Sequence, residues 1–280
     1  KNNTYVNKVS KLIKLTNEGF ELDLSFFDYY TFDRKKNFFT NKFIKVFGKN
    51  RSKNEKITSR HYEIAYAMQL IFERTVNHLL KILKKKSSIK TKNLVLAGGA
   101  AMNCVYNGKL LKNKIYTKSY IPSCPDDLGV SVGALLLAQA KIKSKSKNLN
   151  QNNRTCYWGP NFSDDEILNS IKTFKLHFKV SKNLFKEIAH EISQKKIIGW
   201  FQDGMEFGHR ALGNRSIIAD PREINMQKAV NKAVKFRETF RPFAPAVIGE
   251  KAHKIFELKN SDEILFMERA VQVKKNWKNK

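Results

Sequence analysis

A polar segment near the middle of the chain constrains its fold more than any other feature. Residues 141–155 read KIKSKSKNLNQNNRT, a string of low complexity without hydrophobic periodicity. Such a segment is typical of a linker, because it offers few apolar side chains to bury. A chain of 280 residues is long for one domain and natural for two. We therefore predict one domain over residues 1–142, a linker over 143–154 and a second domain over 155–280.

Helical and strand-like patterns alternate before the linker. Apolar residues recur at helical spacing between residues 64 and 83, and the lysines at 84–86 suit a helix C-terminus, where cations are favoured. The pattern further predicts a strand at 93–97, a helix at 100–111, an extended segment at 115–121 and a helix at 129–140. Such alternation indicates an α/β architecture. The first sixty residues show no clear pattern.

Patterns of the same kind follow the linker. Ser163 and Glu166 have the spacing of a capping box, which predicts a helix start. A helix over 184–194 and a strand over 196–201 come next. Pro221 is placed as in the first turn of a further helix, and apolar residues at helical spacing over 226–234 would continue it.

The charge and the cysteines bear on which classes of protein the chain can belong to. A formal net charge of +28 invites a nucleic-acid interpretation. The lysines are scattered, however, whereas five of the eleven arginines fall between residues 210 and 241. We therefore interpret the bulk charge as a solvated surface and the arginine cluster as the informative part. No apolar run reaches the roughly 18 residues of a membrane span. Three cysteines without a CxxC pair disfavour a disulfide framework or a zinc site and fit a reducing cytoplasm.

The densest group of functional residue types lies at residues 203–222. Three glycines allow a backbone to approach a ligand closely. Five side chains supply hydrogen-bond donors suited to a small phosphate-bearing anion: Arg210, Asn214, Arg215, Ser216 and Arg222. The same residues could instead form a salt-bridged structural turn, with Glu206 and Asp220 as partners. Residue types alone leave both interpretations open.

Three weaker signals accompany this group. Lys235, Arg237 and Arg241 alternate with phenylalanines before Pro242, which suits either a helix end on a core or a rigid anion clamp. Residues 98–103 read GGAAMN, a strand-to-helix turn of a kind that can bind phosphate but is also common in close packing. Asp127, at the start of a glycine-containing helix, is either a helix cap or a metal or nucleotide contact.

Taken together, these segments resemble the carbamoyltransferase family of antibiotic and nodulation-factor biosynthesis. The resemblance runs through nearly the whole chain from about residue 60. It is most specific in MEFGHRALGNRSIIADPR at 205–222 and KFRETFRPFAP at 235–245, behind GGAAMN at 98–103 and DLGVSVG at 127–133. It implies the second half of an actin-like domain over 1–142, followed by an α+β domain similar to threonylcarbamoyl-adenylate synthases over 155–280.

The resemblance also implies a two-step chemistry. Carbamoyl phosphate and ATP would give carbamoyl adenylate, and the carbamoyl group would then pass to a hydroxyl of a small molecule at a site containing iron or another divalent metal. Arg210, Arg215 and Lys235 would be catalytic and Asp127 a metal ligand. The implied ATP and carbamoyl-phosphate site comprises Gly98, Gly99, Asn103, Arg210, Asn214, Arg215, Ser216, Arg222, Lys235, Arg237 and Arg241.

Two departures from the family pattern stand out. His209 occupies a position where the family often has proline. No HxxxH pair occurs, although the family binds its metal through such histidines, and the chain does not begin with methionine. We therefore expect these residues to be part of a longer enzyme and not a competent transferase alone. The alternatives are a non-catalytic nucleotide- or anion-binding remnant and, more remotely, a basic nucleic-acid binder; we expect no nucleic-acid partner.

Overall fold

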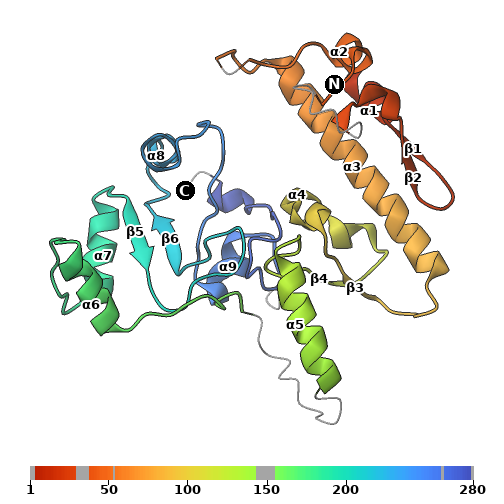
Figure 1. Cartoon of the computed structure of the whole chain (residues 1–280). Coiled ribbons are helices and arrows are strands. Elements are labelled where there is room, and N and C mark those ends of the chain that lie inside the picture. The colour runs from red at the N-terminus through yellow and green to blue at the C-terminus, as the bar shows by residue number, and fades with distance from the viewer. Residues whose placement is uncertain (1–3, 30–37, 53, 143–154, 260–261, 279–280) are drawn as a thin grey trace. The chain divides into compact units, whose positions relative to one another are not determined.

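A computed structural model describes residues 4–29, 38–52, 54–142, 155–259 and 262–278 (Figure 1). The chain is a mixed α/β protein that divides into two compact units. Unit 1 comprises residues 1–93 and 111–118, and unit 2 comprises residues 94–110 and 119–280. The predicted linker at 143–154 lies outside the described residues, so the predicted division at that point stays a prediction.

A long helix organises unit 1. The helix α3 spans Ser59–Lys86, as its apolar periodicity predicts, and it buries Ala67, Ile71, Thr75 and Leu80 along one face. The short helix α1 (Thr4–Ser10) packs against it (Figure 1). Within the described ranges, no helix combines the length and the apolar character needed to cross a membrane.

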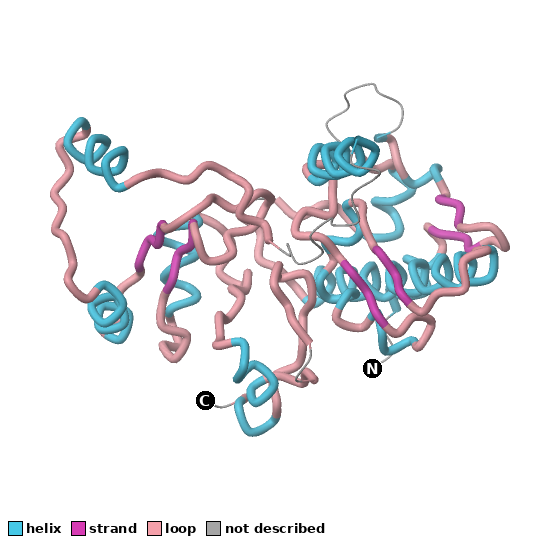
Figure 2. The backbone as a smooth tube through the Cα atoms, turned by 90° about the horizontal axis from the view of Figure 1, so that it is seen from below, coloured by secondary structure: helices cyan, strands magenta, loops and turns pink. Residues whose placement is uncertain are grey.

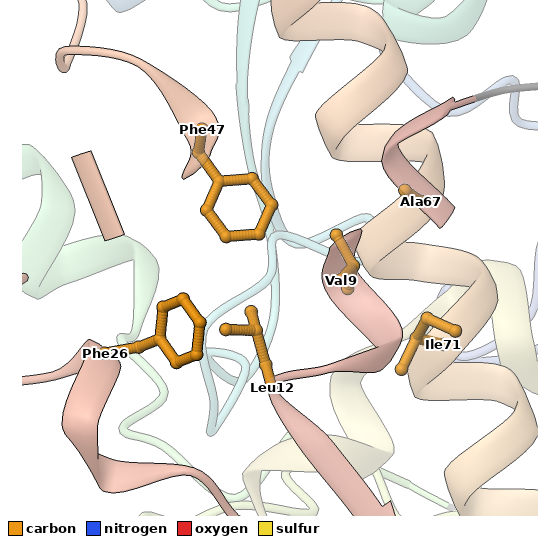
Figure 3. Close-up of a cluster of buried hydrophobic side chains, with 6 residues drawn as sticks. All are labelled: Val9, Leu12, Phe26, Phe47, Ala67 and Ile71. Carbon is orange, nitrogen blue, oxygen red and sulfur yellow. The ribbon is translucent and has the colours of Figure 1, made fainter. Parts of the chain in front are cut away.

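The remaining elements of unit 1 are short and were not predicted. They are β1 (Ile13–Leu15), its antiparallel partner β2 (Phe20–Leu22) and α2 (Asn41–Phe47). Six side chains from α1, α2, α3 and the segments that connect them form one buried apolar cluster (Figure 3): Val9, Leu12, Phe26, Phe47, Ala67 and Ile71. The core therefore joins residues far apart in the sequence, which a local pattern cannot reveal.

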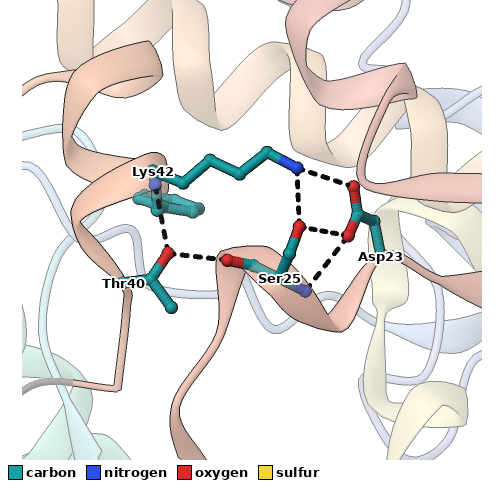
Figure 4. A network of polar contacts seen from close by, with 5 residues as sticks. Asp23, Ser25, Thr40 and Lys42 are labelled. Carbon is teal, nitrogen blue, oxygen red and sulfur yellow. Dashed lines mark hydrogen bonds and ion pairs between the residues drawn. The ribbon is translucent and has the colours of Figure 1, made fainter.

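A polar network beside this core fixes the start of α2 (Figure 4). The Lys42 Nζ lies 3.1 Å from Asp23 Oδ2 and 2.6 Å from Ser25 Oγ. The Thr40 hydroxyl donates to the Ser25 carbonyl at 2.8 Å and accepts from the Phe43 N–H, so Thr40 caps the helix. The Ser25 and Lys42 hydrogen bonds hold the pKa of Asp23 below its usual value.

The segment after α3 corrects one prediction. The strands β3 (Asn93–Val95) and β4 (Lys118–Tyr120) pair, which confirms the expected strand. The helix predicted over 100–111 is wrong, because it is divided into a 3-10 turn at Gly99–Met102, the helix α4 (Cys104–Asn107) and a 3-10 turn at Leu110–Asn113. The Asn103 side chain accepts a hydrogen bond from the Tyr106 N–H at 3.0 Å and so starts a new helix inside the predicted one.

The helix predictions around the linker are confirmed. The helix α5 spans Gly129–Ile142 and buries none of its residues. After the linker, α6 (Asp164–Thr173) begins with the predicted capping box of Ser163 and Glu166, and α7 spans Leu184–Ser193. Periodic helices are therefore found where the sequence places them.

The strands of the second half are short (Figure 2). The predicted strand is present as β5 (Ile198–Phe201), and it pairs in antiparallel fashion with β6 (Arg215–Ile218), which was not predicted. Pro221 does not start a helix. It lies in a turn, and α8 (Met226–Val230) begins only after it, followed by a π-helical turn at Asn231–Lys235 and by α9 (Gly249–Ile255).

Candidate functional site

The arginine-rich segment forms the loop of a β-hairpin. The strands β5 and β6 place Phe201 opposite Arg215 and Trp200 opposite Ser216. Residues 202–214, which we call the anion loop, connect them. Arg215 and Ser216 therefore lie on a strand at the base of the loop, and Arg210 lies within the loop.

Glu206 organises the anion loop from the inside. Its Oε1 accepts backbone N–H donors from Leu212 at 2.6 Å, Asn214 at 2.9 Å and Arg215 at 3.2 Å. Burial raises the pKa of Glu206, but these N–H donors outweigh burial, so the pKa lies below its usual value. The carboxylate thus binds the backbone of the loop and leaves the arginine side chains to other partners.

Two predicted phosphate-binding residues are used to hold the loop together. The buried Asn214 donates from Nδ2 to the Gly204 carbonyl at 2.7 Å and accepts from Gln202 Nε2 at 3.1 Å. The Arg215 guanidinium donates to the carbonyls of Gln202 at 2.5 Å, Asn214 at 2.8 Å and Asp203 at 2.9 Å. It also lies 3.2 Å from the centroid of the Phe201 ring. Their hydrogen-bonding capacity is spent largely on the protein's own backbone.

The segment just after the linker supports the loop from outside, which sequence reasoning missed. The Gly159 N–H donates to the Met205 carbonyl at 2.9 Å, and the Tyr157 hydroxyl donates to the Leu212 carbonyl at 2.8 Å. The Phe207 N–H donates to the Cys156 carbonyl at 2.6 Å. Burial, together with the negative charge of Glu206, raises the pKa of the Cys156 thiol to about 11, so it stays protonated at neutral pH and is a poor nucleophile.

The structural interpretation of the arginine-rich segment holds for Arg222. Its guanidinium binds the buried Asp220 carboxylate, with Nε 2.9 Å from Oδ1 and Nη2 2.6 Å from Oδ2. Hydrogen bonds from Arg222 lower the pKa of Asp220 to about 2. This pair is the salt-bridged turn considered above, and it leaves Arg222 neutralised.

Arg210 differs from these residues. It is half-buried, and its side chain forms no hydrogen bond or ion pair within the described part of the chain. The Ser216 hydroxyl accepts the Gly213 N–H at 3.0 Å and keeps its own proton to donate. The loop therefore presents one uncommitted guanidinium on a backbone that is hydrogen-bonded on both sides.

The second basic group is built around Asn231, whose side chain is 0% exposed. Its Oδ1 accepts from Arg237 Nε at 2.6 Å, and its Nδ2 donates to the Arg241 carbonyl at 3.0 Å. The Arg241 Nε lies 3.0 Å from Glu238 Oε2. Lys235 is exposed, and among the described residues its side chain has no partner. This segment is therefore a tight turn in which Arg237 and Arg241 are engaged and Lys235 is not.

A shallow hollow beside this turn adds cations that sequence reasoning missed. It is lined by Lys228, Lys232, Phe236, Arg237 and Thr239. Lys228 and Lys232 are four residues apart at the end of α8 and the turn after it, so helical spacing was the signal that could have revealed them. The hollow thus has three cationic side chains among its lining residues.

The upstream residues also take specific places. Gly98 has a φ of +93°, and its N–H donates to the Pro125 carbonyl at 2.6 Å. A Cβ atom on Gly98 or Gly99 would meet nothing within 4 Å, so this backbone is open to a ligand. Asn103 caps α4 and is engaged there.

Asp127 and its neighbour Asp126 have different surroundings. Asp127 is exposed, whereas Asp126 Oδ2 lies 2.5 Å from His209 Nε2 of the anion loop. No group of three or more His, Cys, Asp and Glu side chains that could hold a metal occurs among the described residues. The predicted site residues therefore differ in their surroundings, and their roles stay predictions. Gly98 and Gly99 are open, Arg210 and Lys235 are uncommitted among the described residues, and the other donors are partly or wholly engaged.

Comparison with known proteins supplies the family. Residues 3–136 match the sequence family described as carbamoyltransferase N-terminus, and residues 189–280 match the one described as carbamoyltransferase C-terminus. An uncharacterized protein of Synechocystis is 35% identical over 91% of this chain and 42% of its own length. The nodulation protein NolNO of Sinorhizobium fredii is 35% identical over 82% of this chain and 34% of its own.

The nodulation protein NolO of Bradyrhizobium diazoefficiens is 33% identical over 80% of this chain and 41% of its own. The chain thus spans less than half the length of these three relatives. Two family matches in the expected order, one on either side of the predicted linker, together cover most of the sequence. The chain belongs to the carbamoyltransferase family.

Proposed function

We propose that the chain takes part in ATP-dependent O-carbamoyl transfer. Carbamoyl phosphate, water and ATP react to give carbamoyl adenylate, inorganic phosphate and pyrophosphate. The carbamoyl group then passes to a hydroxyl of a small molecule, and AMP is released. The two family matches support this proposal, as do the uncommitted cationic side chains of Arg210 and Lys235. The observation that carries it is the uncommitted guanidinium of Arg210 in an otherwise fully organised loop.

The two steps are assigned to different parts of the chain in this proposal. Residues 155–280 form a domain like the threonylcarbamoyl-adenylate synthases and make the adenylate, and residues 1–142 belong to an actin-like domain that transfers the carbamoyl group. The family matches, at 3–136 and 189–280, fall on opposite sides of the 143–154 linker, which supports this division.

The structure refines the roles proposed for the basic residues. Arg210 and Lys235, with Lys228 and Lys232 of the adjacent hollow, are available to neutralise phosphate oxygens. Neutralising this charge is what allows an oxygen to attack phosphorus. Arg215 supports the reaction by holding the loop, since its donors face backbone carbonyls.

The proposed transfer step involves a divalent metal ion. Asp127 is one exposed carboxylate, and a metal site requires several donors in defined geometry. The described residues include no group of three or more His, Cys, Asp and Glu side chains, so they do not by themselves fit a metal ion. A second candidate is a module that binds ATP or carbamoyl phosphate without producing pyrophosphate, for which the uncommitted Arg210 and Lys235 side chains would suffice.

Replacing Arg210 tests the proposal. Arg210→Ala is expected to reduce carbamoyl-phosphate-dependent ATP–pyrophosphate exchange by about 100-fold or more, the usual effect of removing one charge-stabilising donor. The thermal unfolding midpoint should stay unchanged, because Arg210 has no partner in the described structure. Arg51→Ala is a matched control, since that guanidinium already donates to the Glu55 carbonyl at 2.6 Å. Normal exchange in Arg210→Ala would refute the assignment, and binding without any exchange in the unmodified protein would favour the second candidate.

A further inference from the structure

One side chain of the anion loop reaches back to a turn far away in the sequence. His209 and Asp126 are 83 positions apart, and their Nε2 and Oδ2 atoms are 2.5 Å apart. Both residues belong to unit 2.

The surroundings of Asp126 make this contact the principal one for its carboxylate. The Asp126 side chain is 16% exposed, and its Oδ1 is buried without a hydrogen-bond partner in the described structure. Removing His209 would leave the largely buried Asp126 carboxylate without a cationic or N–H partner. Burying an unpaired carboxylate destabilises the folded state.

The contact is reinforced by the neighbouring residues. A Cβ atom on Gly208 would lie 3.4 Å from Cys124 Cβ, so the loop backbone passes directly over the 123–126 turn. The same turn accepts the Gly98 N–H at the Pro125 carbonyl. Gly208 has a φ of +134°, a conformation open to glycine, and glycine leaves the backbone free to move unless a side chain fixes it.

We infer that His209 is a positioning residue that fixes the anion loop on Asp126 and thereby holds the next side chain, Arg210, in place for its anion. The inference rests on the proposed function. The contact anchors the backbone one residue before the half-buried Arg210 and one residue after Gly208. Fixing the orientation beforehand lowers the entropic cost of binding.

The test is a double-mutant cycle on the whole 280-residue chain, with carbamoyl phosphate as the probe in titration calorimetry. His209→Ala and Asp126→Ala should each weaken binding by about fivefold, and the double variant should bind no worse than either single one. His209→Gln, which keeps an N–H donor, should restore most of the affinity. His177→Ala, at an exposed histidine, is the control and should change nothing. Thermal unfolding of each variant separates lost affinity from lost folding.

Each outcome decides between the two proposals. Wild-type affinity in His209→Ala, additive losses in the double variant, or failure of His209→Gln to restore binding would overturn the positioning role. If Arg210→Ala loses binding while His209→Ala keeps it, the proposed function stands and only the positioning role falls. If the unmodified chain does not bind carbamoyl phosphate, or if Arg210→Ala binds it as tightly as the unmodified chain does, the proposed function fails and this inference fails with it.

Discussion

At the scale of single residues, the shape of the anion loop depends on one carboxylate. Glu206 accepts three backbone N–H donors, and none of them has an equivalent acceptor if the side chain is removed. Glu206→Ala should therefore lower the free energy of unfolding by about 2 kcal/mol at pH 7, within the range for unsatisfied buried groups. Urea denaturation would measure this change in the free energy of unfolding, and its slope against urea concentration should be the same in both proteins.

The pH dependence of this effect follows from the pKa of Glu206, which is lower in the folded protein than its usual value. The stabilisation is present above the ordinary glutamate pKa and is lost as the pH falls through the folded value. Glu250→Ala, at an exposed carboxylate, should change the free energy by less than about 0.5 kcal/mol. Equal losses in the two variants would show that Glu206 does not organise the loop.

Asp220 allows a second prediction at this scale. Its pKa of about 2 is set first by hydrogen bonds from Arg222. Arg222→Gln should raise the Asp220 pKa toward the ordinary value of about 3.9, as measured by NMR titration of the carboxyl carbon. Because the folded pKa is depressed, the stabilisation from this pair is complete above about pH 4 and is lost as the pH falls toward 2. An unchanged pKa in Arg222→Gln would assign the shift to other groups, such as Lys195.

At the scale of secondary-structure elements, periodicity decided what could be predicted. Long or well-capped helices such as α3 and α6 carry their own signal: α3 covers its periodic apolar residues, and α6 begins directly after the predicted cap, Ser163. The strand β6 is four residues long and follows directly on the loop, so no alternation could develop. Asn103 interrupts the helix predicted over 100–111. Its side chain accepts the Tyr106 N–H and so caps a new helix, although the apolar residues around it would suit one continuous helix.

The candidate site was predictable in location but not in the use of each residue. The glycines and arginines of residues 203–222 predict a ligand-binding loop. A loop is present there, between β5 and β6, and its binding of a ligand stays a prediction. The partners of Asn214 and Arg215 are main-chain carbonyls, which exist at every residue and leave no trace in the sequence. For the same reason, the contact between His209 and Asp126 could not be foreseen.

The helix α5 leads to a prediction about an element. It is apolar on all sides, a character usual for buried helices, yet it buries none of its residues, and Leu135 and Leu137 are 72% and 60% exposed. Exposed apolar surface of this kind promotes association. Leu135→Glu with Leu137→Glu should therefore reduce self-association in sedimentation velocity and lower the fluorescence of the apolar dye ANS. Tyr62→Glu, at an exposed site on α3, is the control. Equal dye binding in all three proteins would contradict the prediction.

At the scale of the whole molecule, bulk charge and local site should act independently. The net charge of +28 comes from 53 basic and 25 acidic residues, most of them outside the anion loop. The electrostatic field of positive charges scattered over the chain attracts any polyanion and carries no sequence specificity. The charge alone therefore predicts weak DNA binding, which would be a property of the surface and not of the anion loop.

Salt dependence separates these two contributions. Affinity for a short labelled DNA duplex should fall by about 100-fold or more between 50 and 200 mM salt, because binding is driven by the release of counterions. Arg210→Ala should leave the affinity for DNA unchanged, because it removes only one of 53 basic charges. The same variant is expected to lose carbamoyl-phosphate binding. Fluorescence anisotropy across a salt series measures the first effect and calorimetry the second. DNA binding that persists at high salt, or that depends on Arg210, would make the anion loop a nucleic-acid contact and would favour that alternative over carbamoyl transfer.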